Sequence, residues 1–85
     1  MAKYTVRLSK VAEKQLDKLP YSIARALLEA IAALADNPRP HGCKKLKNRD
    51  AYRIRHGNYR VIYDILDHIL VVDVIAVGHR RDIYK

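Results

Sequence analysis

Residues 51–63 read Ala-Tyr-Arg-Ile-Arg-His-Gly-Asn-Tyr-Arg-Val-Ile-Tyr, and the rest of the chain is arranged around them. Their side chains alternate with a period of two on both sides of Gly57-Asn58, which predicts two antiparallel strands joined by a two-residue turn. A turn of this length fixes the register. The predicted pairs are His56–Tyr59, Arg55–Arg60, Ile54–Val61, Arg53–Ile62 and Tyr52–Tyr63.

This register places three arginines on one face of the hairpin: Arg53, Arg55 and Arg60. Two arginines that pair directly across strands repel each other, and a guanidinium cannot lose its charge. Such a cluster is tolerable when it is well hydrated, paired with carboxylates or used to bind a multiply charged anion. The sequence therefore leaves two interpretations, a phosphate site or a solvated strand face with Asp64 or Asp73 as counter-ions.

The composition is that of a small basic protein. We expect its 85 residues to form a single domain, 1–85, with a modest core. Lysine and arginine outnumber aspartate and glutamate by 17 to 9, which gives a net charge of +8 and a pI near 9.9. An excess of this size favours nucleic acid or another acidic partner.

Several classes of protein are disfavoured by the sequence. The lone Cys43 excludes an internal disulfide, and four histidines without a ligand-like spacing predict neither a metal site nor a cofactor. Residues 1–8 do not resemble a signal peptide, and the most apolar run, 69–77, is too short to cross a membrane as a helix. We therefore expect a soluble cytoplasmic protein without a membrane partner.

The remaining segments predict an α+β fold. Residues 3–8 alternate as a half-buried strand, and Ser9 is a suitable cap for a helix over 10–19. Pro20 separates this helix from a second one over 21–35, and a basic loop over 39–50 follows. Strands over 59–66 and 69–78, joined at Asp67-His68, complete a three-strand antiparallel meander. The expected architecture is a four-stranded antiparallel sheet with the helical hairpin on one face.

A two-residue turn at Asp67-His68 would also set the register of the last strand. Arg60 would then pair with Ile75, Val61 with Val74, and Ile62 with Asp73. The face expected to pack against the helices comprises Tyr52, Ile54, Val61, Tyr63, Ile65, Leu70, Val72, Val74 and Ala76. The other face combines the three arginines with Ile62, Val71, Asp73, Ile75 and Val77. Two helices would leave this second face partly exposed, which implies a protein partner unless loops, the tail or a second copy cover it.

Three motifs in this order connect the chain to a known family. They are Tyr-Arg-Ile-Arg (52–55), Gly-Asn-Tyr-Arg-Val-Ile-Tyr (57–63) and Val-Gly-His-Arg-Arg-Asp-Ile-Tyr (77–84). Together with the order of elements, they resemble the RelE branch of the RelE/ParE toxin superfamily. The resemblance covers nearly the whole chain and is strongest over residues 52–63 and 77–84.

The resemblance implies a toxin of a type II toxin-antitoxin system. Toxins of this branch enter the ribosomal A site and cleave the translated mRNA by attack of a ribose 2′-hydroxyl on the adjacent phosphate, without a metal. A cognate RelB-like antitoxin would neutralise the toxin, and operator DNA would be bound only by the toxin-antitoxin complex. The chemistry needs a base, positive charge around the phosphorane and an acid for the departing 5′-oxygen.

The resemblance also assigns roles to individual residues. Arg60 and Arg80 match arginines that stabilise the transition state, and Tyr84 matches a tyrosine that stacks on the nucleobase and takes part in proton transfer. Arg53 and Arg55 occupy positions where some relatives have lysines, one of them a candidate base. The remaining basic residues are expected to contact RNA: Lys44, Lys45, Lys47, Arg49 and Arg81.

The base is the open point of this assignment, because arginine is not a proton acceptor. The sequence offers His79, Lys45, Lys47 or Tyr84 in its place, and His79 is the one whose ordinary pKa lies near neutrality. Two other functions remain open. One is poisoning of DNA gyrase by a ParE-like toxin, and the other is a degenerate toxin that only binds its antitoxin and acts as an operator co-repressor.

Overall fold

The α+β architecture expected from the sequence is confirmed, with five strands in place of four. The computed structural model describes residues 3–47 and 50–79. Its elements are β1 (Thr5–Leu8), α1 (Lys10–Asp17), α2 (Tyr21–Ala33), β2 (Lys44–Lys45), β3 (Tyr52–His56), β4 (Tyr59–Leu66), a 3₁₀ turn η1 (Asp67–Ile69) and β5 (Val71–His79). The sheet order is β1-β5-β4-β3-β2. The additional strand is β2, which pairs with β3.

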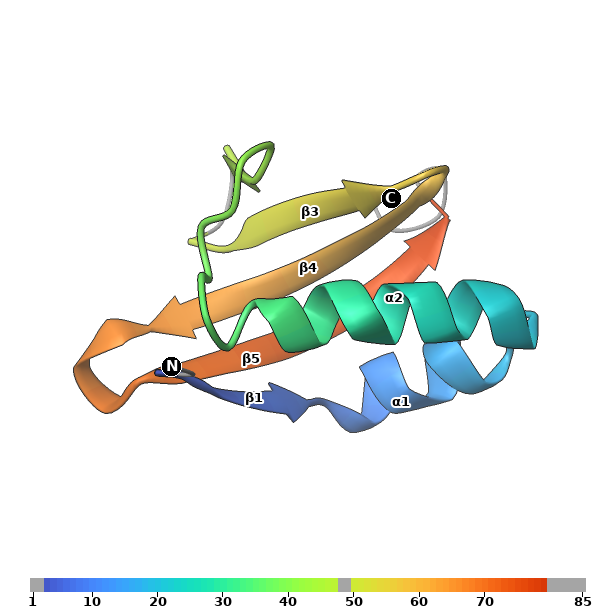
Figure 1. Cartoon of the computed structure of the whole chain (residues 1–85), viewed down its shortest axis with the longest axis horizontal. Coiled ribbons are helices and arrows are strands. Elements are labelled where there is room, and N and C mark those ends of the chain that lie inside the picture. Colours follow the sequence, from blue (N-terminus) through green and yellow to red (C-terminus); the bar gives the residue numbers. More distant parts are fainter. Residues whose placement is uncertain (1–2, 48–49, 80–85) are drawn as a thin grey trace.

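The sheet is not antiparallel throughout, because β1 runs parallel to β5. In Figure 1, β1 lies beside the first half of β5, and α1 continues along the same side of that strand while α2 crosses the sheet. Two polar side chains join α1 to the edge of β5 beyond the end of β1. The hydroxyl of Ser9 donates to the carbonyl of Ile75 at 2.8 Å, and the Gln15 Oε1 accepts from the Val77 N–H at 2.6 Å. The helix thus replaces β1 as the neighbour of β5.

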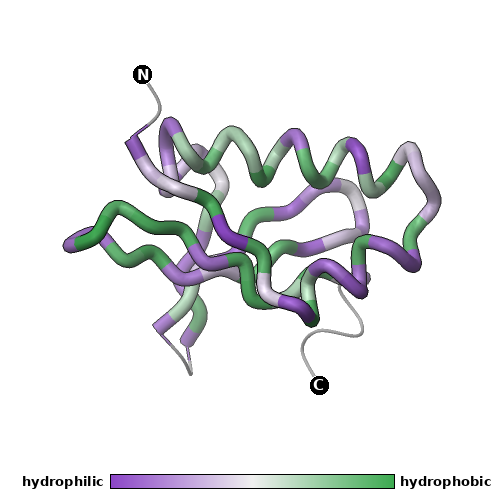
Figure 2. The backbone as a smooth tube through the Cα atoms, turned by 90° about the horizontal axis from the view of Figure 1, so that it is seen from below, coloured by the Kyte–Doolittle hydropathy of each residue, from purple (hydrophilic) through white to green (hydrophobic). Residues whose placement is uncertain are grey.

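Both helices begin where the sequence predicts and end earlier. Ser9 caps α1 through its Oγ, which accepts from the Ala12 N–H at 3.0 Å, and Pro20 is the cap residue of α2. At the end of α2, the N–H groups of Leu34 and Ala35 donate to carbonyls three residues back, so the last turn is 3₁₀ rather than α. In Figure 2, hydrophobic and hydrophilic residues alternate along α2. This is the pattern of a helix with one buried side.

The central hairpin has the register that its sequence predicts. All five pairs from His56–Tyr59 to Tyr52–Tyr63 are present. Gly57 adopts a φ of +62°, whereas the φ of Asn58 is not positive. A positive φ at the first turn residue alone is the pattern of a type II′ turn. Local turn chemistry therefore sets this part of the sheet.

The predicted register between β4 and β5 is wrong. The connection is η1 followed by Leu70, which takes a left-handed φ of 55°, and a bulge interrupts the pairing between Ile62 and Tyr63. The observed pairs include Arg60–Gly78, Val61–Val77, Ile62–Ala76 and Tyr63–Val74. The bulge changes which face each later residue occupies. Val77 consequently faces the helices and is fully buried, while Ala76 lies on the other face and Leu70 is exposed in the turn.

The core lies between the helices and one face of the sheet. Its buried members are Ala12, Leu16, Leu27, Ile31, Leu34, Ile54, Val61, Tyr63, Val72, Val74 and Val77. On the opposite face the expected exposure of apolar residues is wrong for Ile62 and Val71, which are only 4% and 9% exposed. The exposed large apolar residues lie on the helices and in the turn before β5 instead: Val11, Tyr21, Leu28, Ile69 and Leu70.

A polar cluster joins the N-terminal segment, the loop after α2, η1 and the start of β3. We call Tyr4, Arg39 and Asp67 the clasp. Asp67 accepts from the Tyr4 hydroxyl at 2.7 Å and from the Arg39 guanidinium at 2.9 Å, and Arg39 also lies over the ring of Tyr52. The hydrogen bond from Arg39, and then that from Tyr4, lowers the pKa of Asp67 below its ordinary value. Beside the clasp, the buried Tyr63 hydroxyl donates to the Pro38 carbonyl at 2.7 Å.

Within residues 3–47 and 50–79, no helix is long and apolar enough to cross a membrane.

Candidate functional site

The three arginines of the hairpin do share one face of the sheet. Residues that pair directly across neighbouring strands point to the same side. Arg55 pairs with Arg60, and Arg60 pairs with Gly78 on β5, so these positions form one row across the sheet. The next row joins Lys44, Arg53, Ile62 and Ala76. We call the side chains of Lys44, Arg53, Arg55 and Arg60 the basic face.

The charges of the basic face differ in their contact with solvent. Arg53 is only 9% exposed, Arg60 is half-buried and Arg55 is exposed. The stem of a buried arginine packs on neighbouring apolar atoms, here beside Ile62, while the guanidinium keeps its charge. An anion that binds to this face therefore meets positive charge that is partly removed from water, where electrostatic attraction is stronger.

Asp73 is one of the two carboxylates expected as counter-ions of the hairpin arginines, and it forms an ion pair with a different residue. Arg7 on β1 pairs with Asp73 on β5 and donates to both of its carboxylate oxygens, at 2.8 and 3.0 Å. This bidentate pair raises the pKa of Arg7. Among residues 3–47 and 50–79, neither Arg53 nor Arg55 forms an ion pair with a carboxylate. Asp73 is thus not the counter-ion of the basic face.

The two lysines of β2 point to opposite sides of the sheet. Lys44 pairs with Arg53 and belongs to the basic face, whereas Lys45 pairs with Tyr52 on the helix side. Lys45 forms an ion pair with Asp50 at 3.1 Å, and the hydrogen bond to Asp50 raises the pKa of Lys45. From the sequence, both lysines belong to one RNA-contacting loop. Strand β2 separates them, but two consecutive lysines carry no periodicity from which a strand could be predicted.

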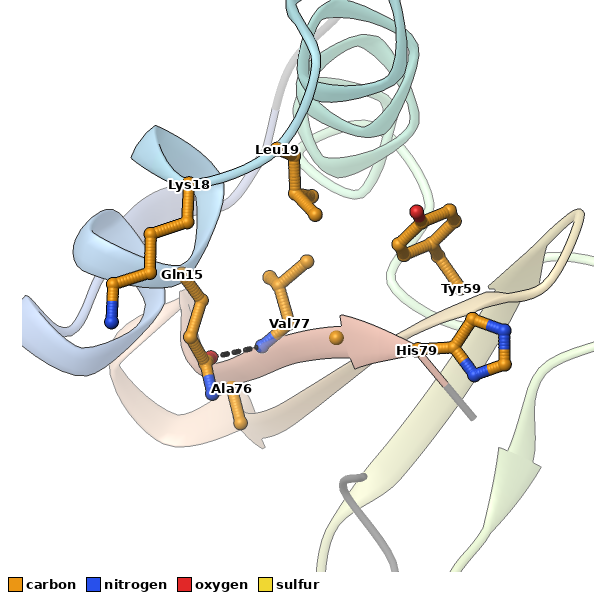
Figure 3. Close-up of a pocket in the computed structure, with 8 residues that line it drawn as sticks. Gln15, Lys18, Leu19, Tyr59, Ala76, Val77 and His79 are labelled. Atoms are coloured by element: carbon orange, nitrogen blue, oxygen red, sulfur yellow. Dashed lines mark hydrogen bonds between the residues drawn. The ribbon is translucent and has the colours of Figure 1, made fainter. Parts of the chain in front are cut away.

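His79, a candidate base, lies on the other side of the sheet from the arginines. It pairs with Tyr59, and their rings meet edge to face with centroids 5.8 Å apart. Tyr59 packs against the core on the helix side. Both rings border a hollow of about 420 Å³ that is also lined by Gln15, Lys18, Leu19, Ala76, Val77 and Gly78 (Figure 3). In this view Gln15 of α1 and Lys18, the residue after α1, lie across the hollow from His79.

The other predicted site residues divide into two groups. Lys47 is exposed just after β2. Arg49, Arg80, Arg81 and Tyr84 lie outside the described residues. The described part of the chain contains no cluster of histidine, cysteine, aspartate or glutamate that could hold a metal ion. The chemistry available on the basic face is thus binding of a phosphate group by guanidinium groups, with one ammonium group beside them.

Comparison with known proteins gives a consistent result along the chain. The sequence model of the family described as "ParE toxin of type II toxin-antitoxin system, parDE" matches residues 6–84. Toxin RelG of Mycobacterium tuberculosis is 39% identical over 85 residues, which cover 96% of this chain and 97% of RelG. The mRNA interferase toxin RelE of Escherichia coli is 30% identical over 80 residues, which cover 92% of this chain and 84% of RelE.

The fold gives the same result as the sequence. The structure is similar to a chain in the crystal structure of the M. tuberculosis toxin-antitoxin complex RelBE2, with a TM-score of 0.81 and 33% sequence identity. The match covers 92% of this chain and 99% of that chain. The likeness therefore extends over nearly the whole length of both chains.

Proposed function

Because this chain belongs to the RelE/ParE toxin family of type II toxin-antitoxin systems, we propose that it is an mRNA interferase that cleaves translated mRNA in the ribosomal A site. The observation that carries the proposal is the basic face, where strand pairing brings Arg53, Arg55 and Arg60 to one side of the sheet. A gyrase poison has no chemical need for such an arrangement, whereas a ribonuclease does. The identity to named mRNA interferase toxins supports the same function.

In the proposed reaction the 2′-oxygen of a ribose attacks the adjacent phosphorus. The bond between the 2′-oxygen and phosphorus forms as the bond between phosphorus and the 5′-oxygen breaks, which leaves a 2′,3′-cyclic phosphate and a 5′-hydroxyl. The phosphorane gains negative charge on its non-bridging oxygens. Arg55 and Arg60, paired across the hairpin, would bind these oxygens, with Arg53 beside them. Arg80 and Tyr84 complete the proposed site as a further cation and a base-stacking ring.

Replacement of Arg60 with alanine tests this function. We expect cleavage of ribosome-bound mRNA to fall by about 10²- to 10³-fold, as is typical when one transition-state donor is removed. The measurement is toeprinting on translating ribosomes with purified protein. Arg25→Ala is the matched control, because Arg25 is an exposed arginine on α2 that pairs with Glu29. Full cleavage by a folded Arg60→Ala variant would rule out the proposed role of the basic face.

Poisoning of DNA gyrase is the second candidate, because the family description that matches the chain is that of ParE toxins. A gyrase supercoiling assay on the same preparation separates the two functions. Inhibited supercoiling together with intact mRNA would replace the ribonuclease proposal. A protein that affects neither target but binds its antitoxin would be the degenerate toxin, which acts only as an operator co-repressor.

The proposed partners are the ribosome, mRNA and a RelB-like antitoxin. A solved relative was crystallised as a toxin-antitoxin complex, and a net charge of +8 suits an acidic antitoxin segment as well as RNA. Operator DNA would be bound only by the toxin-antitoxin complex. If a neighbouring open reading frame encodes a small acidic protein, its co-expression should relieve growth arrest.

A further inference from the structure

We infer that Lys44 is the group that accepts the proton of the attacking 2′-hydroxyl. This inference rests on the ribonuclease function proposed above and addresses what that function leaves open, the identity of the base. Both arginines at the positions where some relatives have lysine, Arg53 and Arg55, are unable to act as proton acceptors. Lys44 lies on β2, and it brings to the basic face the lysine amine that is absent at positions 53 and 55.

The sheet register brings Lys44 to the arginines. It pairs directly with Arg53, which places the two residues on neighbouring strands about 4.8 Å apart. The row of Arg55 and Arg60 lies two residues further along β3 and β4, a distance of roughly 7 Å. Lysine and arginine side chains that project from adjacent rows of one face can converge on a single phosphodiester. Lys44 is also exposed, so solvent can exchange its proton.

The other candidates from the sequence fit the role less well. His79 and Lys45 both project from the helix side of the sheet, away from the basic face. Lys45 is further held in its charged form by the ion pair with Asp50. Lys44 takes part in none of the ion pairs among residues 3–47 and 50–79. Of the described residues on the basic face, Lys44 is therefore the one whose cation can become a proton acceptor.

The proton balance of the step is simple. The neutral amine of Lys44 takes the proton of the 2′-hydroxyl as the 2′-oxygen bonds to phosphorus. The 5′-oxygen leaves with the electron pair of its bond to phosphorus and takes a proton from water. The resulting Lys44 ammonium returns its proton to solvent after the products leave. Because only the neutral amine is active, the cleavage rate must rise with pH.

Lys44→Arg is the decisive variant, because it keeps the positive charge and removes the proton acceptor. We expect its single-turnover cleavage rate on programmed ribosomes to fall by about 10²- to 10⁴-fold, the usual contribution of a general base, with little change in ribosome binding. The rise of the rate with pH should disappear as well. Lys14→Arg makes the same change at an exposed lysine of α1, outside the proposed site, and should cleave like the unsubstituted protein.

A second variant tests the chemistry directly. Lys44→Ala opens space beside Arg53, and added small primary amines should restore part of its activity in proportion to the concentration of neutral amine. Thermal melting and antitoxin binding serve as folding controls for both variants. Wild-type cleavage rates and an unchanged pH profile in Lys44→Arg would overturn the role of Lys44 while leaving the ribonuclease intact. Absence of cleavage by the unsubstituted protein would instead remove the proposed function itself, and this inference with it.

Discussion

Ser9 connects two parts of the chain through one hydroxyl group. Its Oγ accepts from the Ala12 N–H at the start of α1, and its O–H group donates to the Ile75 carbonyl in β5. The first bond satisfies a helix terminus, and the second satisfies a strand edge that β1 no longer reaches. A single atom therefore anchors the helix to the strand.

We expect Ser9→Ala to lower the free energy of unfolding by about 1–2 kcal/mol, because both the cap and the bond to the strand edge are lost. Urea denaturation followed by circular dichroism measures this change. Ser22→Ala is the control, since Ser22 is exposed in the first turn of α2. Equal stability of the two variants would show that neither bond of Ser9 matters.

The sequence predicts the face of the sheet for some charged residues and not for others. Arginines 53, 55 and 60 could be grouped from the sequence because a short turn sets their register. Lys44 and His79 could not be assigned in this way. The face of Lys44 depends on a two-residue strand without periodicity, and the face of His79 depends on a bulge four residues before it.

At the level of elements, the hairpin of β3 and β4 depends on one residue with a left-handed backbone. A Cβ added at Gly57 would meet no atom within 4 Å, so the cost of a larger residue is conformational rather than steric. We expect Gly57→Ala to destabilise the protein by about 1–2 kcal/mol. Asn58→Ala should cost less, because Asn58 does not have a positive φ. Urea denaturation of both variants checks the order, and equal losses would contradict this explanation.

The connections between strands explain which strand pairings can be predicted from the sequence. Strands β3 and β4 are joined by a two-residue turn, so local rules are enough to pair them. The pairing of β4 with β5 depends on η1, a left-handed Leu70 and a bulge, none of which has a clear sequence signal. The parallel pairing of β1 with β5 joins residues 66 positions apart, as between Arg7 and Asp73. Such contacts follow from the packing of the whole chain.

At the level of the whole molecule, the clasp makes stability depend on pH. Its three members come from the N-terminal segment, the loop after α2 and η1. Because the pKa of Asp67 is lowered in the folded state, its contribution to stability is fully present above its ordinary value of 3.8 and is lost as the pH falls through the lowered pKa.

Asp67→Asn should therefore lower the melting temperature at neutral pH, and the difference from the unsubstituted protein should shrink as the pH falls below about 3.8. Differential scanning calorimetry between pH 2 and pH 7 follows both proteins, roughly the range over which such a carboxylate titrates. Asp36→Asn is the control, because Asp36 is exposed after α2. A melting-temperature difference that stays constant down to the lowest pH would show that the charge of Asp67 is not what stabilises the clasp.

The strand order determines when this protein can fold during its synthesis. The last strand, β5, inserts between β1 and β4, so β1 has no neighbour in the sheet until residues 71–79 have been synthesised. A nascent chain that already carries Arg53, Arg55 and Arg60 still lacks the strand that completes its core. Products of synthesis interrupted before residues 71–79 should therefore be unfolded and harmless, and the protein can threaten its host only once this strand has been translated.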